Sequence, residues 1–310
     1  MRDFPDYPFT PHRFEVRPGI AMSFLDEGPR DGEVVVMLHG NPSWSFYWRH
    51  LVLGLRDPAA GKGYRCIVPD HVGMGLSDKP DDAPSAVPRY DYTLQSRIDD
   101  LDALLRHLGI DGPVTLVVHD WGGMVGFGWA LRDPSRVKRL VITNTASFPL
   151  PAAKRFPRRL AMGRDSRLGG WLIRRFNLFA RGAAWFGTTR SLPKGVRDAY
   201  AGVYDGWTNA ISTLRFMQDI PLGEGDRAWA LLAAAEAALP GYADRPAFIG
   251  WGLRDFVFDK HFLAGFRAAL PRAEVQAFDD AGHYLLEDKH EVLVPAIRAF
   301  LDAHPLPAGA

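Results

Sequence analysis

The stretch that decides the fold is Val114-Thr-Leu-Val-Val-His-Asp-Trp-Gly-Gly123. An apolar strand ends there and passes through two glycines directly into a segment with helical spacing. This is the layout of a nucleophile elbow, G-x-S-x-G, in which small residues permit a sharp turn that lifts the nucleophile above the sheet. Asp120 occupies the serine position, and Val118 replaces the first glycine. The stretch therefore predicts a carboxylate nucleophile, although Asp120 taken alone could also cap the helix.

A carboxylate nucleophile needs a partner that completes the reaction. Attack at a saturated carbon gives an ester, which water can cleave to regenerate the enzyme. His283 lies in Asp280-Ala-Gly-His-Tyr284, directly after the last predicted strand. Residues at the carboxyl ends of parallel strands meet over one crevice, so we expect His283 to meet Asp120 although they are 163 positions apart in the chain. His283 is then the predicted general base.

A histidine base needs an acid that orients its other nitrogen. Asp255 follows the predicted strand 247–251, again at a carboxyl end. Asp259 is a nearby competitor, whereas the strand 137–143 is followed by Asn144 and offers no acid at its own tip. We predict that Asp255 is the acid.

The loop His39-Gly40-Asn41-Pro42 follows the apolar run 34–38. Above a nucleophile elbow, such a loop supplies one backbone N–H to the oxyanion site, and the residue after the nucleophile supplies the other. These residues are Asn41 and Trp121, and both also carry side-chain N–H donors. Two neutral donors suit a departing halide or carboxylate, although Asn41 could also be a turn residue ahead of proline.

Strands and helices alternate over most of the chain, which predicts an α/β fold with a mostly parallel, doubly wound sheet. From Phe148 to Pro240 this alternation of strands and helices stops, and no convincing strand is found. We interpret 148–240 as a helical cap (lid) inserted into one core domain made of 1–147 and 241–310. The expected strands are 14–16, 20–25, 34–38, 65–68, 114–118, 137–143, 247–251 and 274–278, and the expected helices are 44–55, 93–108, 122–131, 260–270 and 292–301.

Composition restricts the class of protein. The chain has 310 residues, 47% of them apolar, with 37 basic and 36 acidic side chains, as in a folded globular protein. The single cysteine, Cys66, cannot form an internal disulfide, and neither a signal pattern nor an apolar run near 18 residues is found. We therefore expect a cytoplasmic protein that does not span a membrane. Phosphate-cradle and metal motifs are also missing, so no cofactor and no metal are expected.

The predicted cap has an unusual composition. Between Ala152 and Ala199 it carries twelve Lys or Arg against two Asp. Such an excess can attract acidic partners or an anionic surface, or it can be a solvated helix face. The cap is also rich in aromatic residues, which could line an apolar pocket or simply pack as core. These are Phe148, Trp171, Phe176, Phe179, Trp185, Phe186, Trp207 and Phe216.

With HGNP at 39–42, VHDWGG at 118–123, the acid at 255 and AGHY at 281–284, the chain resembles the haloalkane dehalogenases of the α/β-hydrolase fold. The resemblance extends from about Phe14 to Leu301. A combination of Asn41 with a late acid is similar to the third dehalogenase subfamily, since another subfamily has its acid where this chain has Asn144. The roles implied are nucleophile for Asp120, base for His283, acid for Asp255 and leaving-group donors for Asn41 and Trp121.

Longer stretches, NPSWSFYWRHL, DHVGMGLSDKP, RFMQDIPL and GHYLLEDKHEV, resemble the β-lactone decarboxylases of long-chain olefin biosynthesis. That resemblance implies a cis-β-lactone substrate with two long alkyl chains, which yields a cis-olefin and carbon dioxide. Residue chemistry alone leaves haloalkane dehalogenase as an alternative activity, and attack at the carbonyl or at the ring carbon stays open. Tyr200 and Tyr204 keep epoxide hydrolase as a further alternative, which the donor Asn41 disfavours. We expect an apolar small-molecule substrate, no nucleic acid, and a basic cap that is a candidate site for partner enzymes of the same pathway.

Overall fold

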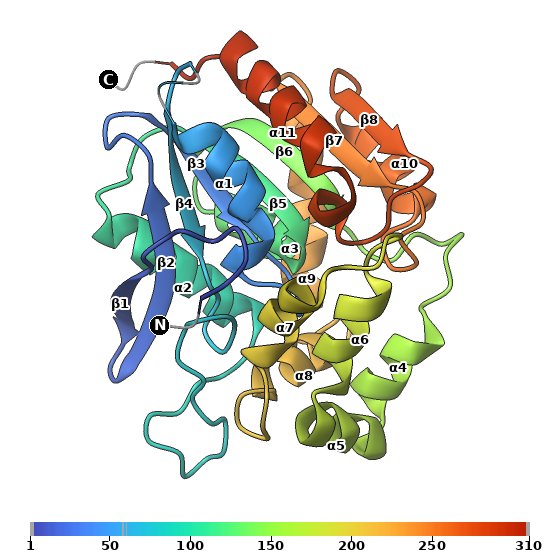
Figure 1. Ribbon diagram of the computed structural model, residues 1–310. Helices are drawn as coiled ribbons and strands as arrows, with labels where there is room; N and C mark the ends of the chain where they lie inside the picture. Colours follow the sequence, from blue (N-terminus) through green and yellow to red (C-terminus); the bar gives the residue numbers. More distant parts are fainter. Residues whose placement is uncertain (1–2, 58, 60, 308–310) are drawn as a thin grey trace.

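The computed structural model describes residues 3–57, 59 and 61–307, and the centre of the described chain is an eight-stranded sheet (Figure 1). The strand order is β1-β2-β4-β3-β5-β6-β7-β8. β2 pairs antiparallel with β1 and with β4, and the remaining neighbours pair in parallel. The strands are β1 (His12–Arg17), β2 (Ile20–Glu27), β3 (Glu33–Leu38), β4 (Tyr64–Pro69), β5 (Val114–Asp120), β6 (Val137–Thr145), β7 (Ala247–Gly252) and β8 (Glu274–Phe278).

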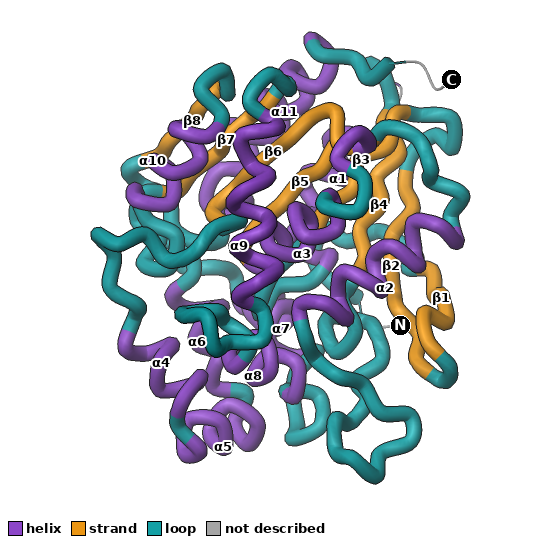
Figure 2. Tube along the Cα trace, turned by 180° about the vertical axis from the view of Figure 1, so that it is seen from behind, coloured by secondary structure: helices purple, strands orange, loops and turns teal. Residues whose placement is uncertain are grey.

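Helices cover both faces of this sheet, and this is why its central strands are continuous apolar runs. α1 (Arg49–Arg56) and α11 (Leu285–Ala303) lie on the face turned to the viewer in Figure 1. α2 (Leu94–His107), α3 (Trp121–Ala130), α9 (Trp229–Ala238) and α10 (Lys260–Ala269) cover the opposite face, seen in Figure 2. Every residue of β5 is buried as a result.

Two core helices differ from the sequence expectation. The helix expected over 44–55 is a 3-10 turn, η1 (Ser45–Trp48), followed by α1. The last helix was expected to begin at Val292, but α11 begins at Leu285 and contains a break at Lys289, where φ is −139°. Its first turn carries the chain from His283 into the core, and only the part beyond the break has the helical apolar spacing that the sequence reveals.

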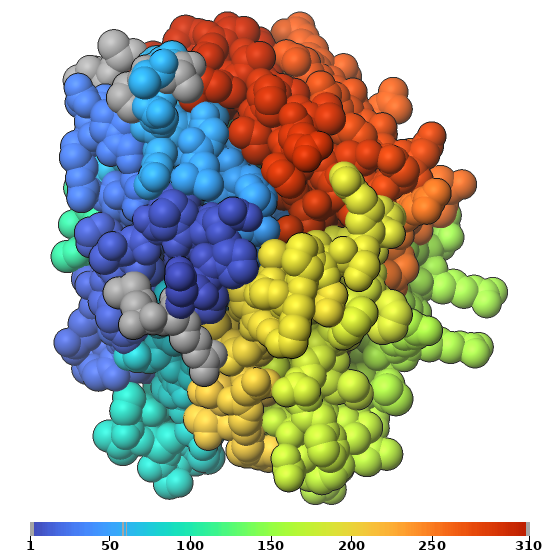
Figure 3. Space-filling model, in the orientation of Figure 1, coloured from blue at the N-terminus to red at the C-terminus, as the bar shows by residue number. Residues whose placement is uncertain are grey.

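Between β6 and β7 the described chain is helical. α4 (Arg158–Asp165), α5 (Arg167–Phe176), α6 (Leu178–Phe186), α7 (Lys194–Gly202) and α8 (Ile211–Gln218) form a layer beyond the carboxyl ends of the strands, and this layer occupies one end of the molecule in Figure 3. α9 and the 3-10 turn η4 (Leu239–Tyr242) follow, and α9 packs against α3 of the core. Within the described residues, no helix combines the length and the apolar character needed to cross a bilayer.

Candidate active site

Asp120 ends β5 and immediately precedes α3. Its backbone has φ 52° and ψ −127°, a strained conformation for a residue other than glycine that costs about 1–3 kcal/mol. The paired glycines make the turn possible because there is no room for a side chain at either position. A Cβ on Gly122 would lie 2.0 Å from the carbonyl oxygen of Leu38, and one on Gly123 would lie 2.1 Å from Oγ1 of Thr145.

The Asp120 carboxylate is buried beneath the loop that follows β3. The backbone N–H of Asn41 donates a hydrogen bond to Oδ1 of Asp120 over 2.6 Å. A Cβ on Gly40 would lie 2.0 Å from the same oxygen, so only glycine leaves space for the carboxylate. Burial raises the pKa of Asp120, while His283 and the backbone N–H groups of Asn41 and Trp121 oppose that rise. The carboxylate is thus poorly solvated, and a poorly solvated carboxylate is a more reactive nucleophile.

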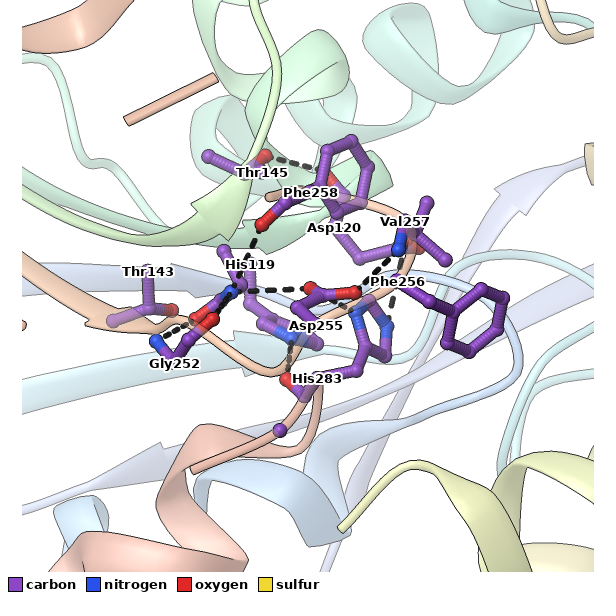
Figure 4. Close-up of polar contacts among 12 residues, drawn as sticks. His119, Asp120, Thr143, Thr145, Gly252, Asp255, Phe256, Val257, Phe258 and His283 are labelled. Carbon is purple, nitrogen blue, oxygen red and sulfur yellow. Dashed lines mark hydrogen bonds and ion pairs between the residues drawn. The ribbon is translucent and has the colours of Figure 1, made fainter. Parts of the chain in front are cut away.

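His283 lies between two carboxylates. Its Nδ1 is 2.8 Å from Oδ2 of Asp255, and its Nε2 is 3.7 Å from Oδ2 of Asp120. Figure 4 shows the Asp255 carboxylate next to the His283 ring. Burial by itself lowers the pKa of His283, but the charge and hydrogen bond of Asp255 and the charge of Asp120 outweigh it, so the pKa is raised above its ordinary value. The structure therefore brings together the three residues that we expected from three separate strand ends.

The Asp255 carboxylate is held from two sides. The backbone N–H of Val257 donates to its Oδ1 over 2.7 Å, and Nδ2 of Asn144 donates to its Oδ2 over 3.1 Å. The competitor Asp259 instead accepts a hydrogen bond from Lys154 over 2.8 Å and caps α10. Of the two aspartates considered, Asp255 is thus the one in contact with the histidine.

His119, the residue before Asp120, also contacts the site, and we did not anticipate it. Its Nε2 donates to the backbone carbonyl of His283 over 2.8 Å, since a carbonyl can only accept. The ring stacks on Tyr47 with centroids 4.3 Å apart. Burial holds the pKa of His119 well below its ordinary value, so this imidazole is neutral. In the sequence, the position of His119 one residue before the nucleophile, at the same strand end, is the feature that indicates its place in the site.

The two predicted donors differ in their surroundings. Nδ2 of Asn41 donates to the carbonyl of Thr213 in α8 over 2.9 Å, so one of its two side-chain N–H bonds is occupied by the cap. Trp121 lines the cavity, and its ring packs against Phe216 with centroids 5.1 Å apart. None of the described residues accepts a hydrogen bond from its indole N–H.

A cavity of about 440 Å³ extends from Asp120 through the cap. Asn41, Asp120, Trp121 and His283 form its polar end, and Lys154 and Arg159 also line it. The other lining residues are apolar side chains and glycines. Three of the aromatic residues expected there line it, namely Phe148, Phe179 and Phe186. Phe216 is buried against Trp121, as the alternative of core packing predicts, whereas Trp171, Phe176, Trp185 and Trp207 are exposed and neither line the cavity nor pack as core.

The two tyrosines considered for epoxide opening do not line this cavity. The Tyr200 hydroxyl donates to Glu287, and the Tyr204 hydroxyl donates to the carbonyl of Ser43 over 3.1 Å. Both side chains are fully buried. Neither hydroxyl is therefore placed to protonate a molecule above Asp120.

The arrangement is suited to covalent catalysis by a carboxylate. The buried carboxylate can form an ester with a substrate, and the histidine, oriented by a second acid, can assist its release. The apolar cavity provides space for the substrate. Within the described part of the chain, no three or more His, Cys, Asp and Glu residues are grouped so that they could hold a metal ion.

Comparisons with known proteins show which family and which solved structures the chain is similar to. The family model described as alpha/beta hydrolase fold matches residues 33–290. A cis-3-alkyl-4-alkyloxetan-2-one decarboxylase from Xanthomonas campestris pv. campestris is 71% identical, over 98% of this chain and 99% of the relative. A protein of the same name from Shewanella oneidensis is 50% identical, over 95% of this chain and 89% of the relative. The crystal structure of haloalkane dehalogenase DbeA from Bradyrhizobium elkani USDA94 superimposes with a TM-score of 0.82 at 27% identity, covering 95% of this chain and 98% of that one.

Proposed function

Because the chain belongs to the α/β-hydrolase family, we propose that it is an enzyme that decarboxylates a cis-β-lactone with two alkyl chains, releasing a cis-olefin and carbon dioxide. The similarity to two cis-3-alkyl-4-alkyloxetan-2-one decarboxylases supports this substrate class. The observation that carries the proposal is the position of Asp120 and His283 at the polar end of a cavity whose lining is mostly apolar. Such a cavity favours alkyl chains, since each buried methylene contributes roughly 0.8 kcal/mol.

We propose that Asp120 opens the lactone at the ring carbon that bears the ring oxygen. One carboxylate oxygen forms a bond to this saturated carbon while the bond to the ring oxygen breaks, and the electron pair of that bond stays on the ring oxygen. The product is an ester between Asp120 and the alkyl chain, with a free carboxylate on the neighbouring carbon. The indole N–H of Trp121 and the remaining side-chain N–H of Asn41 are the donors available to this new carboxylate.

The ester then fragments without water. The carbon–carbon bond to the new carboxylate breaks, its electrons form the double bond, and the ester bond breaks to return the electron pair to Asp120. Carbon dioxide, the olefin and the free Asp120 carboxylate account for all atoms and charges. Attack by Asp120 inverts the configuration of the ring carbon that bore the ring oxygen. Carbon dioxide and the Asp120 carboxylate then depart from opposite faces of the bond that becomes the double bond. The two steps together leave both alkyl chains on the same side of that double bond. A cis-lactone therefore gives a cis-olefin.

His283 and Asp255 act on Asp120 in this scheme. An imidazolium 3.7 Å from Oδ2 of Asp120 stabilises the carboxylate as it departs. Asp255, at 2.8 Å from Nδ1, holds the ring in place and favours its charged form. His119 fixes the backbone of His283 through its hydrogen bond to the carbonyl.

Hydrolytic dehalogenation is the second candidate activity, and the likeness to haloalkane dehalogenase DbeA supports it. Asp120 would then displace a halide, and His283 would remove a proton from the water that cleaves the ester. Only this second reaction consumes water.

We also propose a cytoplasmic location, because the single cysteine, Cys66, is buried and cannot form an internal disulfide.

The proposal is tested by incubating the purified protein with a long-chain cis-β-lactone and analysing the products by gas chromatography. Equal amounts of cis-olefin and carbon dioxide are expected, with no β-hydroxy acid. A β-hydroxy acid as the enzymatic product would instead mean that the lactone is hydrolysed.

A further inference from the structure

Part of the lining of the cavity is also exposed to solvent. Five of its lining residues are also exposed, and they define the mouth: Arg159, Met162, Leu178, Phe186 and Phe256. Four of these five side chains are large and apolar, and Phe186 is 71% exposed. An aqueous entrance would normally be polar, so a mouth of this kind is unusual for a protein whose ligand arrives from water.

Exposed apolar side chains continue from the mouth over the cap. Eight large hydrophobic residues of the cap are between 46% and 71% exposed: Met162, Leu168, Trp171, Phe176, Leu178, Trp185, Phe186 and Trp207. Elsewhere in the described chain only Val87, Phe256 and Val292 are exposed to at least this extent, and Phe256 belongs to the mouth. The exposed apolar surface is thus concentrated on the cap.

The same part of the cap carries uncompensated positive charge. Most other basic residues of the cap contact carboxylates, as Arg164 does with Asp226 and Arg181 with Asp205. The exceptions are concentrated in and just before α4 and α5. Five exposed arginines there have no carboxylate within salt-bridge distance among the described residues, and we call them the arginine cluster: Arg155, Arg158, Arg159, Arg167 and Arg175.

α5 shows how the two features combine. Leu172 and Ile173 turn one side of the helix toward the cavity. Leu168 and Trp171, three positions apart, turn another side to solvent together with Arg175. A helix that presents leucine, tryptophan and arginine to solvent has the composition of a segment that lies in a membrane interface, where apolar rings enter the acyl boundary and arginines meet anionic headgroups.

We propose that the outer surface of α4, α5 and α6, around the mouth, docks on an anionic lipid bilayer. Charge complementarity selects this occupant, because the arginine cluster has no carboxylate partners and phosphate headgroups supply the missing anions. The ligand in this inference rests on the proposed function. A mouth docked on the bilayer would admit a two-chain lactone directly from the lipid, without transfer through water.

Sedimentation with vesicles tests the docking itself, without reference to catalysis. The full-length protein is mixed with vesicles of phosphatidylcholine alone or with phosphatidylglycerol added, at low and high salt. We expect binding to the anionic vesicles, weaker binding at high salt and little binding to phosphatidylcholine alone.

Two double variants separate the charged and the apolar contributions. Arg158→Glu with Arg167→Glu reverses two charges of the arginine cluster, and should weaken partition into anionic vesicles by at least about tenfold. Leu168→Ser with Trp171→Ser removes apolar contacts, and should weaken binding even at low salt. None of these four residues lines the cavity.

The matched control is Arg267→Glu with Val292→Ser, an exposed arginine and an exposed valine on α10 and α11 of the core. It should bind vesicles as the unaltered protein does, and the melting temperatures of all three variants should show that they are folded. Equal vesicle binding by the control and the cap variants would overturn the proposal. Light scattering that reveals a dimer broken by the cap substitutions, with no vesicle binding, would assign this surface to a second copy of the chain instead.

Turnover assays distinguish a failure of the docking proposal from a failure of the proposed function. If docking is correct, the cap variants turn over a detergent-dispersed lactone normally but consume a vesicle-borne lactone more slowly. Vesicle binding by a protein that leaves every lactone intact would keep the docking surface and reject the decarboxylase.

Discussion

Asn144 donates a hydrogen bond to the Asp255 carboxylate over 3.1 Å, although 111 positions separate the two residues in the chain. Asn144 is at the end of β6, with a positive φ of 24°. Its side chain also accepts from the backbone N–H of Gly252 over 2.8 Å and donates to the Gly252 carbonyl over 3.0 Å. The tip of one strand thus fixes both the end of the next strand and the acid that orients His283.

We predict that Asn144→Ala lowers the free energy of unfolding by about 1–3 kcal/mol, because the buried N–H and carbonyl of Gly252 lose their partner. Turnover should fall by about tenfold or more, since a shift of roughly 1 Å in a catalytic group can cost about 100-fold. The check is denaturant unfolding together with a pH profile of kcat for the lactone, whose alkaline side should move to lower pH because the imidazolium of His283 loses the stabilisation from an oriented Asp255.

Ser147→Ala is the matched control for Asn144→Ala. The Ser147 hydroxyl is buried and has no hydrogen-bond partner among the described residues, so its removal should leave stability and turnover nearly unchanged. Equal effects of the two substitutions would show that Asn144 has no special role in holding the acid loop.

The sequence predicts the framework of this site for a physical reason. Strands such as 34–38 and 114–118 are buried on both faces, so their runs of apolar residues are unambiguous. A parallel sheet then places every carboxyl end at the same edge. Asp120, His283 and Asp255 each come at or shortly after the end of a strand, and this position alone is enough to group them into one site.

Other features depend on tertiary contacts that leave no periodic pattern. The Asn41 side chain bonds to a cap carbonyl 172 positions away, at Thr213. Aromatic residues are common in the cap, but their spacing does not reveal whether a ring faces the cavity, as Phe179 does, or solvent, as Trp171 does. The inner and outer sides of short helices are set by how these helices pack on one another, and propensity and spacing do not specify that packing.

Asp120→Asn should abolish turnover of every substrate while the protein stays folded. An amide is a poor nucleophile, and the substitution preserves the shape of a side chain that has little room beside Gly40. Circular dichroism and the melting temperature report folding, and mass spectrometry of the intact protein excludes deamidation back to aspartate. Activity above a few per cent of the original level in an undeamidated sample would remove Asp120 from the mechanism.

His283→Ala should separate the two candidate reactions. With a long haloalkane the ester on Asp120 forms but is not hydrolysed, so the intact protein should gain the mass of the alkyl group. With the cis-lactone, olefin formation should slow without stopping, because fragmentation of that ester requires no water. If neither an alkyl adduct nor any loss of turnover is found, His283 is not part of the catalytic machinery.

The raised pKa of His283 gives the two reactions different pH profiles. The imidazole stays protonated at pH values above its ordinary pKa of 6.5, so hydrolysis of an alkyl ester, which needs the neutral form, should decline as the pH falls through the raised value. Lactone turnover should persist to lower pH, until Asp120 is protonated near its own raised pKa. Asp255→Asn removes the charge that favours the imidazolium, and should therefore shift the decline of ester hydrolysis to lower pH. Identical acid limits for both reactions would contradict this assignment.

The most direct test of the central claim is a side-by-side assay of three long-chain compounds with the purified protein: a cis-β-lactone, a 1-bromoalkane and an epoxide. We predict that the lactone is consumed fastest and yields cis-olefin and carbon dioxide. The trans-lactone should be poor, because one of its chains would point at the wall that holds Asn41 and Trp121. Short bromoalkanes should also be poor, because each methylene they lack forgoes roughly 0.8 kcal/mol of binding. Release of bromide with the lactone untouched would contradict the account and make the protein a haloalkane dehalogenase, and diol from the epoxide with both other compounds inert would make it an epoxide hydrolase.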